Sequence, residues 1–160
     1  MRNFQDRVPD QKTIELLLKA ATRAPSAGNL QPWHFYVIYN RPVKEKLAAA
    51  ALAQRHVASA PLVVVVCVDQ DRSARRYGGR GRDLYCIQDA AAATQNLLLA
   101  AVDQGLAGCW VGAFDEREVA RLLKAPRGRR PLALVPLGYP ARPLRLSSRR
   151  ELDETVTFLE

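Results

Sequence analysis

The sequence has few of the residues that build disulfide frameworks or metal sites. Its 160 residues include three cysteines and two histidines, with no Cys-x-x-Cys pair and no His-Glu-x-x-His motif. Two of the cysteines, Cys67 and Cys109, lie in apolar sequence, which favours free, mostly buried thiols over disulfides. We therefore expect neither a disulfide framework nor a bound metal.

Long hydrophobic runs are also absent. The longest, residues 61–68, has the length of a strand, whereas a membrane-spanning helix needs about 18 or more apolar residues. No signal-peptide hydrophobic segment occurs in residues 1–20, so we expect a cytoplasmic protein that does not contact membranes. Length and composition predict one domain over residues 1–160, with 151–160 as a C-terminal extension.

The charge balance is strongly basic. Lysine and arginine number 24 against 16 acidic residues, a net charge of +8, and 19 of the 24 are arginines. Such an excess suits nucleic acid, phosphorylated small molecules or simple solubility. No predicted helix carries a basic stripe, and aromatic and basic residues do not interleave, so a nucleic-acid-binding domain is the less favoured interpretation.

Hydrophobic periodicity predicts that helices and strands alternate irregularly. The helices are expected at 11–24, 43–54, 89–105 and 115–124, and the strands at 34–39, 61–68, 106–112 and 131–137. Residues 61–68 do not alternate, which indicates burial on both faces, and prolines in 131–137 favour an edge strand or a bulge. Residues 69–83 are expected to form a loop. The pattern is typical of an α+β protein or a three-layer αβα sandwich.

Local signals mark the ends of three of these helices. Asp10 is a predicted N-cap, Asp115 with Glu118 forms a predicted capping box, and Gly105 is expected just after the helix 89–105. That helix is apolar on most of its circumference. It is therefore expected to lie in a core or at an interface.

The segment 24–33, Ala-Pro-Ser-Ala-Gly-Asn-Leu-Gln-Pro-Trp, places polar groups between a helix and a strand. Ser26 and Asn29 offer donors and acceptors, and Gly28 permits close approach of the backbone to a planar ligand. The same residues also suit a helix stop followed by a rigid turn, with Trp33 in the core. The residues alone leave both interpretations open.

Five separated blocks of the sequence resemble the FMN-dependent nitroreductase family. The blocks are residues 24–33, 77–85, 88–99, 105–114 and 136–140. They keep the family's order and spacing from about residue 2 to residue 152. The resemblance implies an α+β, three-layer sandwich that works as an intertwined homodimer, with two FMN sites shared across the interface.

The resemblance also implies which residues contact the flavin. They are, in chain order, Arg2; Pro25, Ser26, Ala27 and Asn29; Gln54 and Arg55; Val111 and Gly112; and Arg149 and Arg150. Residues 25–29 match the loop that lies against the flavin ring, reaching across from the partner subunit. Arg2 matches a basic position at the flavin or its ribityl chain.

The remaining matches surround other parts of the cofactor. Gln54 and Arg55 match polar positions at the pyrimidine end of the ring, and residues 111–112 match the backbone near the flavin N5. Arg149 and Arg150 match the residues that hold the phosphate, a role that suits paired guanidinium groups. A solvated charged tail is the alternative for these two arginines.

One feature of the family pattern is missing. Family members usually carry a basic triplet before the position of Arg2, and this sequence does not contain it. Either the sequence begins inside a longer chain, or the phosphate relies on the C-terminal arginines alone.

The implied activity needs no side-chain nucleophile, because the flavin N5 carries the chemistry. The resemblance implies that NADH or NADPH donates hydride and that a nitroaromatic, quinone or similar small molecule accepts it, by a ping-pong mechanism. Tyr77 and Tyr85 are candidate substrate residues in a lid, or else belong to a mobile surface loop. The alternatives are a flavin-binding redox protein and a specialised family member without general nitroreductase turnover.

Overall fold

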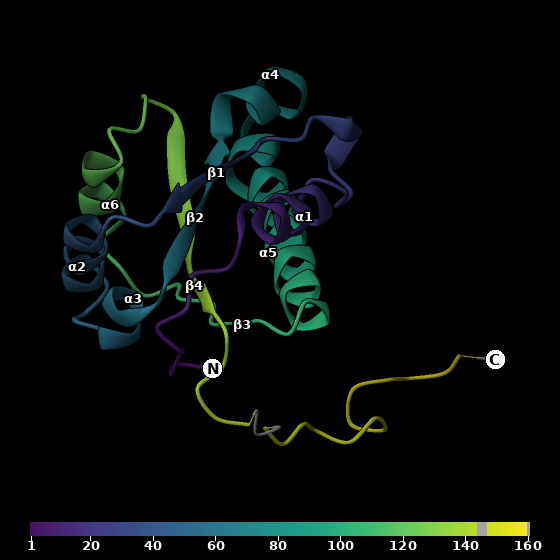
Figure 1. The fold of residues 1–160 in the computed structure, drawn as a ribbon. Coiled ribbons are helices and arrows are strands. Elements are labelled where there is room, and N and C mark those ends of the chain that lie inside the picture. Colours follow the sequence, from purple (N-terminus) through teal and green to yellow (C-terminus); the bar gives the residue numbers. More distant parts are fainter. Residues whose placement is uncertain (144–146, 160) are drawn as a thin grey trace.

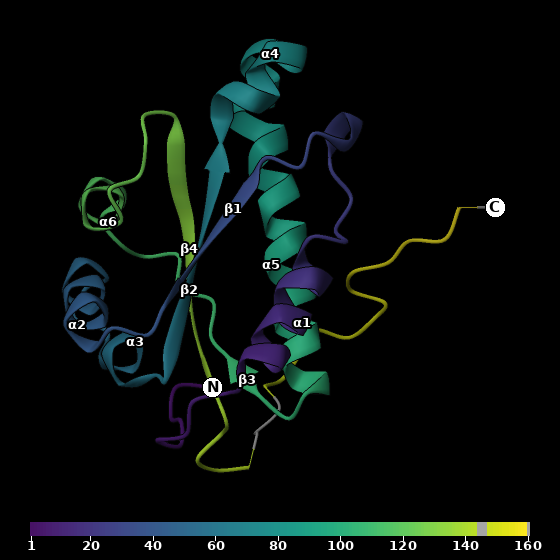
Figure 2. The ribbon, with the colours of Figure 1, turned by 45° about the horizontal axis from the view of Figure 1, so that its top comes forward.

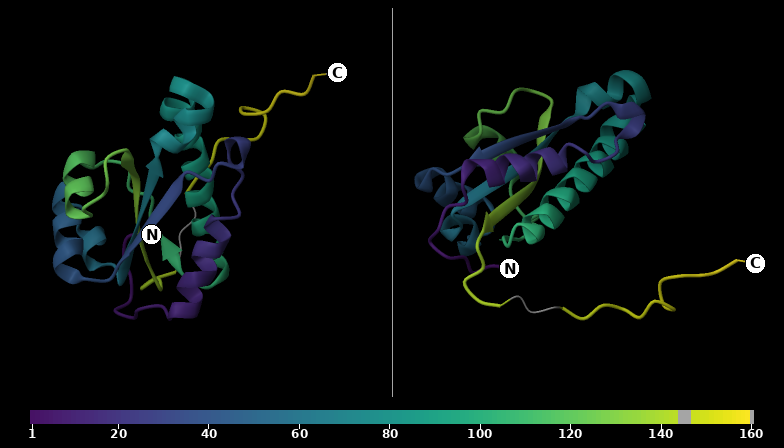
Figure 3. Two further views of the ribbon diagram at one scale, coloured as in Figure 1. Left: turned by 90° about the horizontal axis from the view of Figure 1, so that it is seen from above. Right: turned by 45° about the vertical axis from the view of Figure 1, so that its right-hand side comes forward.

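A four-stranded antiparallel sheet lies between two layers of helices in the computed structural model, which describes residues 1–143 and 147–159 (Figure 1). The strands are β1 (Trp33–Ile38), β2 (Leu62–Asp69), β3 (Ala107–Gly108) and β4 (Arg129–Gly138), in the order β1-β2-β4-β3. The helices are α1 (Gln11–Ala21), α2 (Arg41–Ala50), α3 (Arg55–Ser59), α4 (Gln70–Arg80), α5 (Cys86–Asp103) and α6 (Glu116–Leu122). Helices α1 and α5 cover one face, and α2, α3 and α6 the other (Figures 2 and 3). The predicted three-layer α+β sandwich is confirmed.

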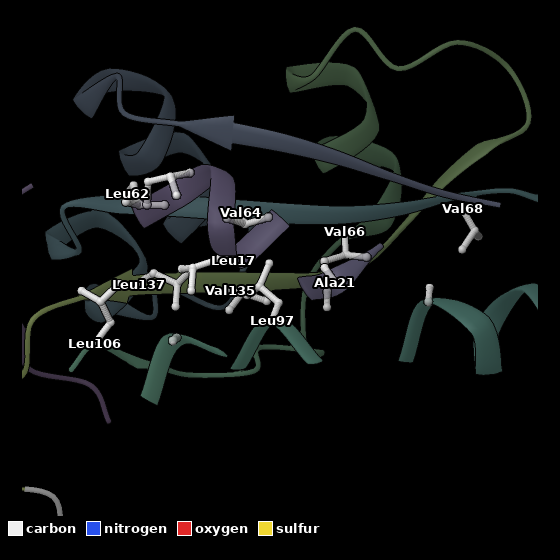
Figure 4. Packing of buried hydrophobic residues seen from close by; sticks show 14 of the residues in the cluster. Leu17, Ala21, Leu62, Val64, Val66, Val68, Leu97, Leu106, Val135 and Leu137 are labelled. Atoms are coloured by element: carbon white, nitrogen blue, oxygen red, sulfur yellow. The ribbon is translucent and has the colours of Figure 1, made fainter. Parts of the chain in front are cut away.

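Strand β2 is buried on both faces, as its lack of alternation predicted. Successive side chains of a strand point to opposite faces, so one strand supplies two cores. Leu62, Val64, Val66 and Val68 pack with α1 and α5 (Figure 4). The residues between them, Val63, Val65 and Cys67, pack with the helices of the other face.

The structure confirms the predicted bulge in β4 and corrects the prediction of an edge. The register between β2 and β4 shifts between Val66 and Cys67, beside Pro131. However, β4 lies inside the sheet, because the short β3 and an isolated bridge from Val111 to Leu134 cover its other side. The predicted strand 106–112 is therefore reduced to two residues and this bridge.

The predicted helix ends are confirmed at three places. The Asp10 carboxylate accepts a hydrogen bond from the Thr13 amide at 2.8 Å and caps α1. Asp115 accepts from the Arg117 and Glu118 amides and caps α6. The other half of the predicted capping box does not form, because the Asp115 amide donates to the Ala50 carbonyl. Gly105 follows α5 with a φ of +69°, in the left-handed region that glycine adopts without penalty.

The prediction of a loop at residues 69–83 is wrong. Asp69 caps α4 by accepting from the Arg72 amide, and a π-helical turn, η2 (Gly81–Tyr85), joins α4 to α5. A Cβ on Gly81 would overlap the Ser73 carbonyl oxygen, so this glycine permits close packing of the turn on the helix. Gly81 therefore serves tight packing, whereas Gly78, with φ of +57°, kinks α4 near its end.

Two helix boundaries also differ from the prediction. The helix expected at 43–54 ends at Ala50, and α3 forms separately after it. Helix α5 begins at Cys86, three residues before its predicted start. Its buried face contributes Leu97 to the core, whereas Leu99 and Val102 on another face are 60% and 57% exposed. None of the helices in the described residues is long and apolar enough to cross a membrane.

Two neighbouring leucines of α1 give a matched test of the core. Leu17 is 1% exposed and Leu16 is 42% exposed. We expect Leu17→Ala to lower the free energy of unfolding by about 2–5 kcal/mol, because it leaves a cavity. Leu16→Ala should cost less than about 1 kcal/mol. Urea denaturation measures both, and equal losses would contradict the packing of α1 on the sheet.

Candidate functional site

The loop between α1 and β1 holds an unfavourable backbone conformation. Its 3₁₀ turn, η1 (Ala27–Asn29), includes Gly28 and Asn29, both with φ of +55°, and Gln31 follows with φ of +50°. A left-handed conformation costs a non-glycine residue roughly 1–2 kcal/mol. Such a loop persists only when surrounding contacts fix it, and strained backbone of this kind clusters at functional sites.

Helix α4 supplies part of this support. The Arg76 guanidinium donates to the Gly28 carbonyl at 3.4 Å, and Arg72 donates to the Leu30 carbonyl. The Tyr77 hydroxyl lies only 2.6 Å from the position that a Cβ on Gly28 would occupy, so a larger residue would overlap it. The loop and α4, far apart in the sequence, are therefore packed together (Figure 1).

Asp89 supplies the other part from the start of α5. Its Oδ1 accepts a hydrogen bond from the Ala27 amide at 3.0 Å, and the residue is only 6% exposed. Within the described part of the chain, its Oδ2 is buried without a hydrogen-bond partner. Burial raises the pKa of this carboxyl, and the bond from Ala27 opposes that change. Asp89 lies in the block 88–99 that resembles the family, but the sequence analysis did not assign it to the site.

A second group of predicted residues lies around α3. Gln54 precedes α3 and donates from its amide to the Ala113 carbonyl at 3.4 Å, which links it to residues 111–112. The Val111 side chain is buried, at 3% exposure, whereas a Cβ built on Gly112 would find no atom nearer than 3.9 Å. Gly112 thus presents open backbone, whereas the Val111 amide donates to the Leu134 carbonyl at 2.9 Å and the Val111 carbonyl accepts from the Leu134 amide at 3.0 Å.

Arg2 also belongs to the group around α3, because its positive charge acts on a residue of that helix. It is exposed and lies near His56, the second residue of α3. Burial lowers the pKa of His56, and the charges of Arg2 and of the terminal amine lower it further. This end of the molecule is therefore a positive environment that disfavours protonation of His56.

Arg55 lines an open groove of about 660 Å³ between α2, α3 and the N-terminal segment. Lys44 lies in its wall with 6% exposure and donates to the carbonyls of Ala60 and Pro61. Burial lowers the pKa of Lys44, and the charge of Arg41 lowers it further. The two carbonyl bonds indicate that Lys44 joins α2 to the start of β2.

The structure does not bring the two groups together within one chain. The loop 25–29 leads into Trp33, which pairs with Val68 at one end of β2, whereas α3 leads into Leu62 at the other end. The seven steps between Leu62 and Asp69, at about 3.3 Å each, separate these ends by roughly 23 Å. The predicted site residues of one chain therefore fall into two separate groups, the loop 25–29 beside one end of β2 and the residues around α3 beside the other, which we call the first and second candidate half-sites. Residues 111–112 lie nearer the middle of the sheet, because Val111 bridges Leu134, which pairs with Val65.

Arg149 and Arg150 lie with neither half-site. They are exposed on the C-terminal tail, which runs away from the body of the molecule (Figures 1 and 3). Arg149 donates to the Ser148 carbonyl at 2.9 Å, and Arg150 pairs with Glu154 at 3.2 Å. Their bonds within the described residues are thus confined to the tail.

The candidate substrate residues meet beside the first half-site. The rings of Tyr77 and Tyr85 contact edge to face, with centroids 5.2 Å apart. Both lie in the helical segment that replaces the predicted loop, so the expected lid is an ordered α4–η2 unit. In residues 1–143 and 147–159, no three His, Cys, Asp or Glu side chains are grouped to hold a metal ion.

Comparison with known proteins now decides the family. The model of the Nitroreductase family matches residues 1–56 and 50–139. The chain belongs to the nitroreductase family. Membership confirms the resemblance, the nitroreductase fold and the enzyme class, an NAD(P)H-dependent oxidoreductase.

Individual relatives agree with this membership. A protein of Archaeoglobus fulgidus assigned as an NADH dehydrogenase/NAD(P)H nitroreductase is 38% identical over 144 residues, which cover 88% of this chain and 79% of the relative. An NADH dehydrogenase of Thermus thermophilus is 31% identical over an alignment of 184 residues, covering 98% and 89%. The NADPH:FMN oxidoreductase of Vibrio harveyi, solved with NAD+, has a TM-score of 0.89 at 25% identity and covers 99% of this chain and 72% of its own.

Asp89 offers a local test of the loop. We expect Asp89→Ala to accelerate hydrogen exchange of the Ala27 amide by about ten- to a hundredfold, because a bond to a charged acceptor contributes roughly 1.5–3 kcal/mol. Asp89→Asn retains an acceptor oxygen and should accelerate it much less. Mass spectrometry of the peptide 24–31 measures the exchange. Equal exchange in the two variants would refute the role of Asp89.

Proposed function

We propose that this nitroreductase-family chain binds FMN and catalyses hydride transfer from NADH or NADPH to a nitroaromatic, quinone or similar acceptor by a ping-pong mechanism. When bound, FMN supplies a reversible hydride-accepting centre at its N5. The single observation that carries the proposal is the pair of half-sites, one with a strained polar loop and one with open backbone beside basic side chains.

The half-sites fit the cofactor when two copies share them. We propose a homodimer in which the loop 25–29 of one copy faces Arg2, Gln54, Arg55 and Gly112 of the other. The roughly 23 Å between the two ends of β2, beside which the half-sites lie, supports this arrangement, because no single copy brings them together. The exposed Leu99 and Val102 of α5 add an apolar surface for a second copy to cover.

Each half-site has a distinct task in this proposal. The loop residues Ser26 and Asn29 flank the flavin, and their positions depend on Asp89 and α4. Gln54 and Arg55 provide donors at the pyrimidine edge, where preorganised donors stabilise developing negative charge. The backbone at Gly112 leaves room beside the reacting position. The donor leaves before the acceptor enters the same space.

Donor-dependent bleaching tests the function directly. We expect the protein to gain visible flavin absorbance with FMN, to lose it anaerobically with NADH or NADPH, and to recover it when a nitroaromatic or quinone is added. A protein that binds no FMN would overturn the proposal. A yellow protein that neither donor bleaches would instead be a flavin-binding redox protein that uses another donor.

The C-terminal arginines test the proposed phosphate contact. We expect Arg149→Ala with Arg150→Ala to weaken FMN binding by about ten- to a hundredfold, because charge-assisted bonds contribute roughly 1.5–3 kcal/mol. Fluorescence titration with FMN measures the affinity. Arg127→Ala, an exposed arginine before β4, is the control and should leave it unchanged. Unchanged affinity for FMN in the double variant would instead support the alternative, in which these arginines belong to a solvated charged tail.

A further inference from the structure

The segment from Arg72 to Arg82 concentrates positive charge beside the loop between α1 and β1. It contains five arginines, and Arg82 alone among them forms an ion pair in the described residues, with Asp71 at 2.5 Å. The other four arginines are exposed, and their partners in this part of the structure are carbonyl or hydroxyl oxygens where they have any. The net charge at this end of the molecule is thus uncompensated.

Two of these arginines are ordered against aromatic rings. The Arg76 guanidinium lies 5.5 Å from the centroid of Tyr77, and that of Arg80 lies 5.3 Å from the centroid of Tyr85. Arg80 also donates from Nε to the Tyr85 hydroxyl at 2.9 Å. Because the two rings contact each other, the segment presents a fixed set of two cations and two phenols. Arginines that serve solubility alone need no such ordering.

This set lies directly against the first half-site. Arg76 donates to the Gly28 carbonyl, and the Tyr77 hydroxyl packs on Gly28 itself. Each guanidinium has five N–H donors, and the hydrogen bonds of Arg76 and Arg80 within the described residues use one apiece. The unused donors match the oxygens of a carboxylate, and the phenol rings match an aromatic ring.

We propose that Arg76 and Arg80 are specificity-determining residues that favour electron acceptors bearing a carboxylate on an aromatic ring. The inference rests on the proposed function and names the acceptor class for that site. In the reaction considered, an aromatic nitro group is reduced by two electrons to a nitroso group. One NADH or NADPH is oxidised, one further proton is consumed, and one water leaves with a nitro oxygen.

The test compares 4-nitrobenzoate with its neutral analogue 4-nitrobenzamide. With FMN-loaded protein and saturating NADPH or NADH, the ratio of kcat/KM for the two acceptors is measured in the wild type and in Arg76→Gln with Arg80→Gln. We expect the double variant to lower the ratio by about five- to tenfold, the range for two exposed charge contacts. Loss of the Arg76 bond to the loop affects both acceptors alike, so the ratio isolates the charge.

A matched control removes the same charge elsewhere. Arg75→Gln with Arg127→Gln deletes two exposed arginines, neither of which stacks on Tyr77 or Tyr85, and should leave the ratio within about twofold. Raising the salt concentration should reduce the wild-type preference for 4-nitrobenzoate and leave the Arg76/Arg80 variant almost unaffected.

Three results with the variants would overturn the inference. An unchanged ratio in the double variant is the first, and an equal fall in the control is the second. The third is a rise in KM for NADPH without a change in the acceptor ratio, which would assign the arginines to the donor's phosphates. A wild type that reduces 4-nitrobenzamide without preferring 4-nitrobenzoate refutes this inference alone. Failure to reduce both of these acceptors and a quinone with either donor refutes the proposed function, and this inference falls with it.

Discussion

The burial of β2 on both faces is the constraint on which the rest of the structure depends. One strand of aliphatic residues supplies alternate side chains to two cores, so helices must cover both faces of the sheet. Helices α1 and α5 meet one set and α2, α3 and α6 the other. The same strand also fixes the positions of the two half-sites, because the loop before β1 and the helix before β2 adjoin its opposite ends. The distance between the half-sites is thus a consequence of strand length.

The first half-site shows how a strained loop is kept in place. Asn29 and Gln31 have positive φ, and bonds within the loop, such as that from the Gln31 amide to the Ser26 hydroxyl, hold them together with contacts from α4 and from Asp89 in α5. Asp89 is itself costly, since one of its oxygens is buried without a partner in the described residues. The contacts of α4 join the flavin loop, as proposed, to the side chains that would meet the acceptor. A substitution in α4 is therefore expected to alter the loop, and a substitution in the loop is expected to alter α4.

Acidic residues and the arginines of α4 differ in how far their charges are paired. Acidic residues on the body are largely occupied by helix caps and local ion pairs, as with Asp115 at α6 and Glu116 with Arg130. The arginines of α4 have no such partners in the described residues and gather beside the strained loop. The net charge of +8 therefore reflects local concentrations of arginine, which a nucleic-acid-binding stripe does not explain.

The sequence by itself determined the three longer strands, the N-caps of α1 and α6, the three-layer architecture and the family, because those depend on local periodicity, short polar signals and motif order. It did not predict α4 or the turn η2, since the packing of Gly81 on Ser73 involves contacts that composition cannot show. It also missed Asp89, whose partner Ala27 is 62 residues away. Only the tertiary structure decided that the predicted flavin residues before the C-terminal tail form two separate groups, because their separation depends on which end of β2 each segment adjoins.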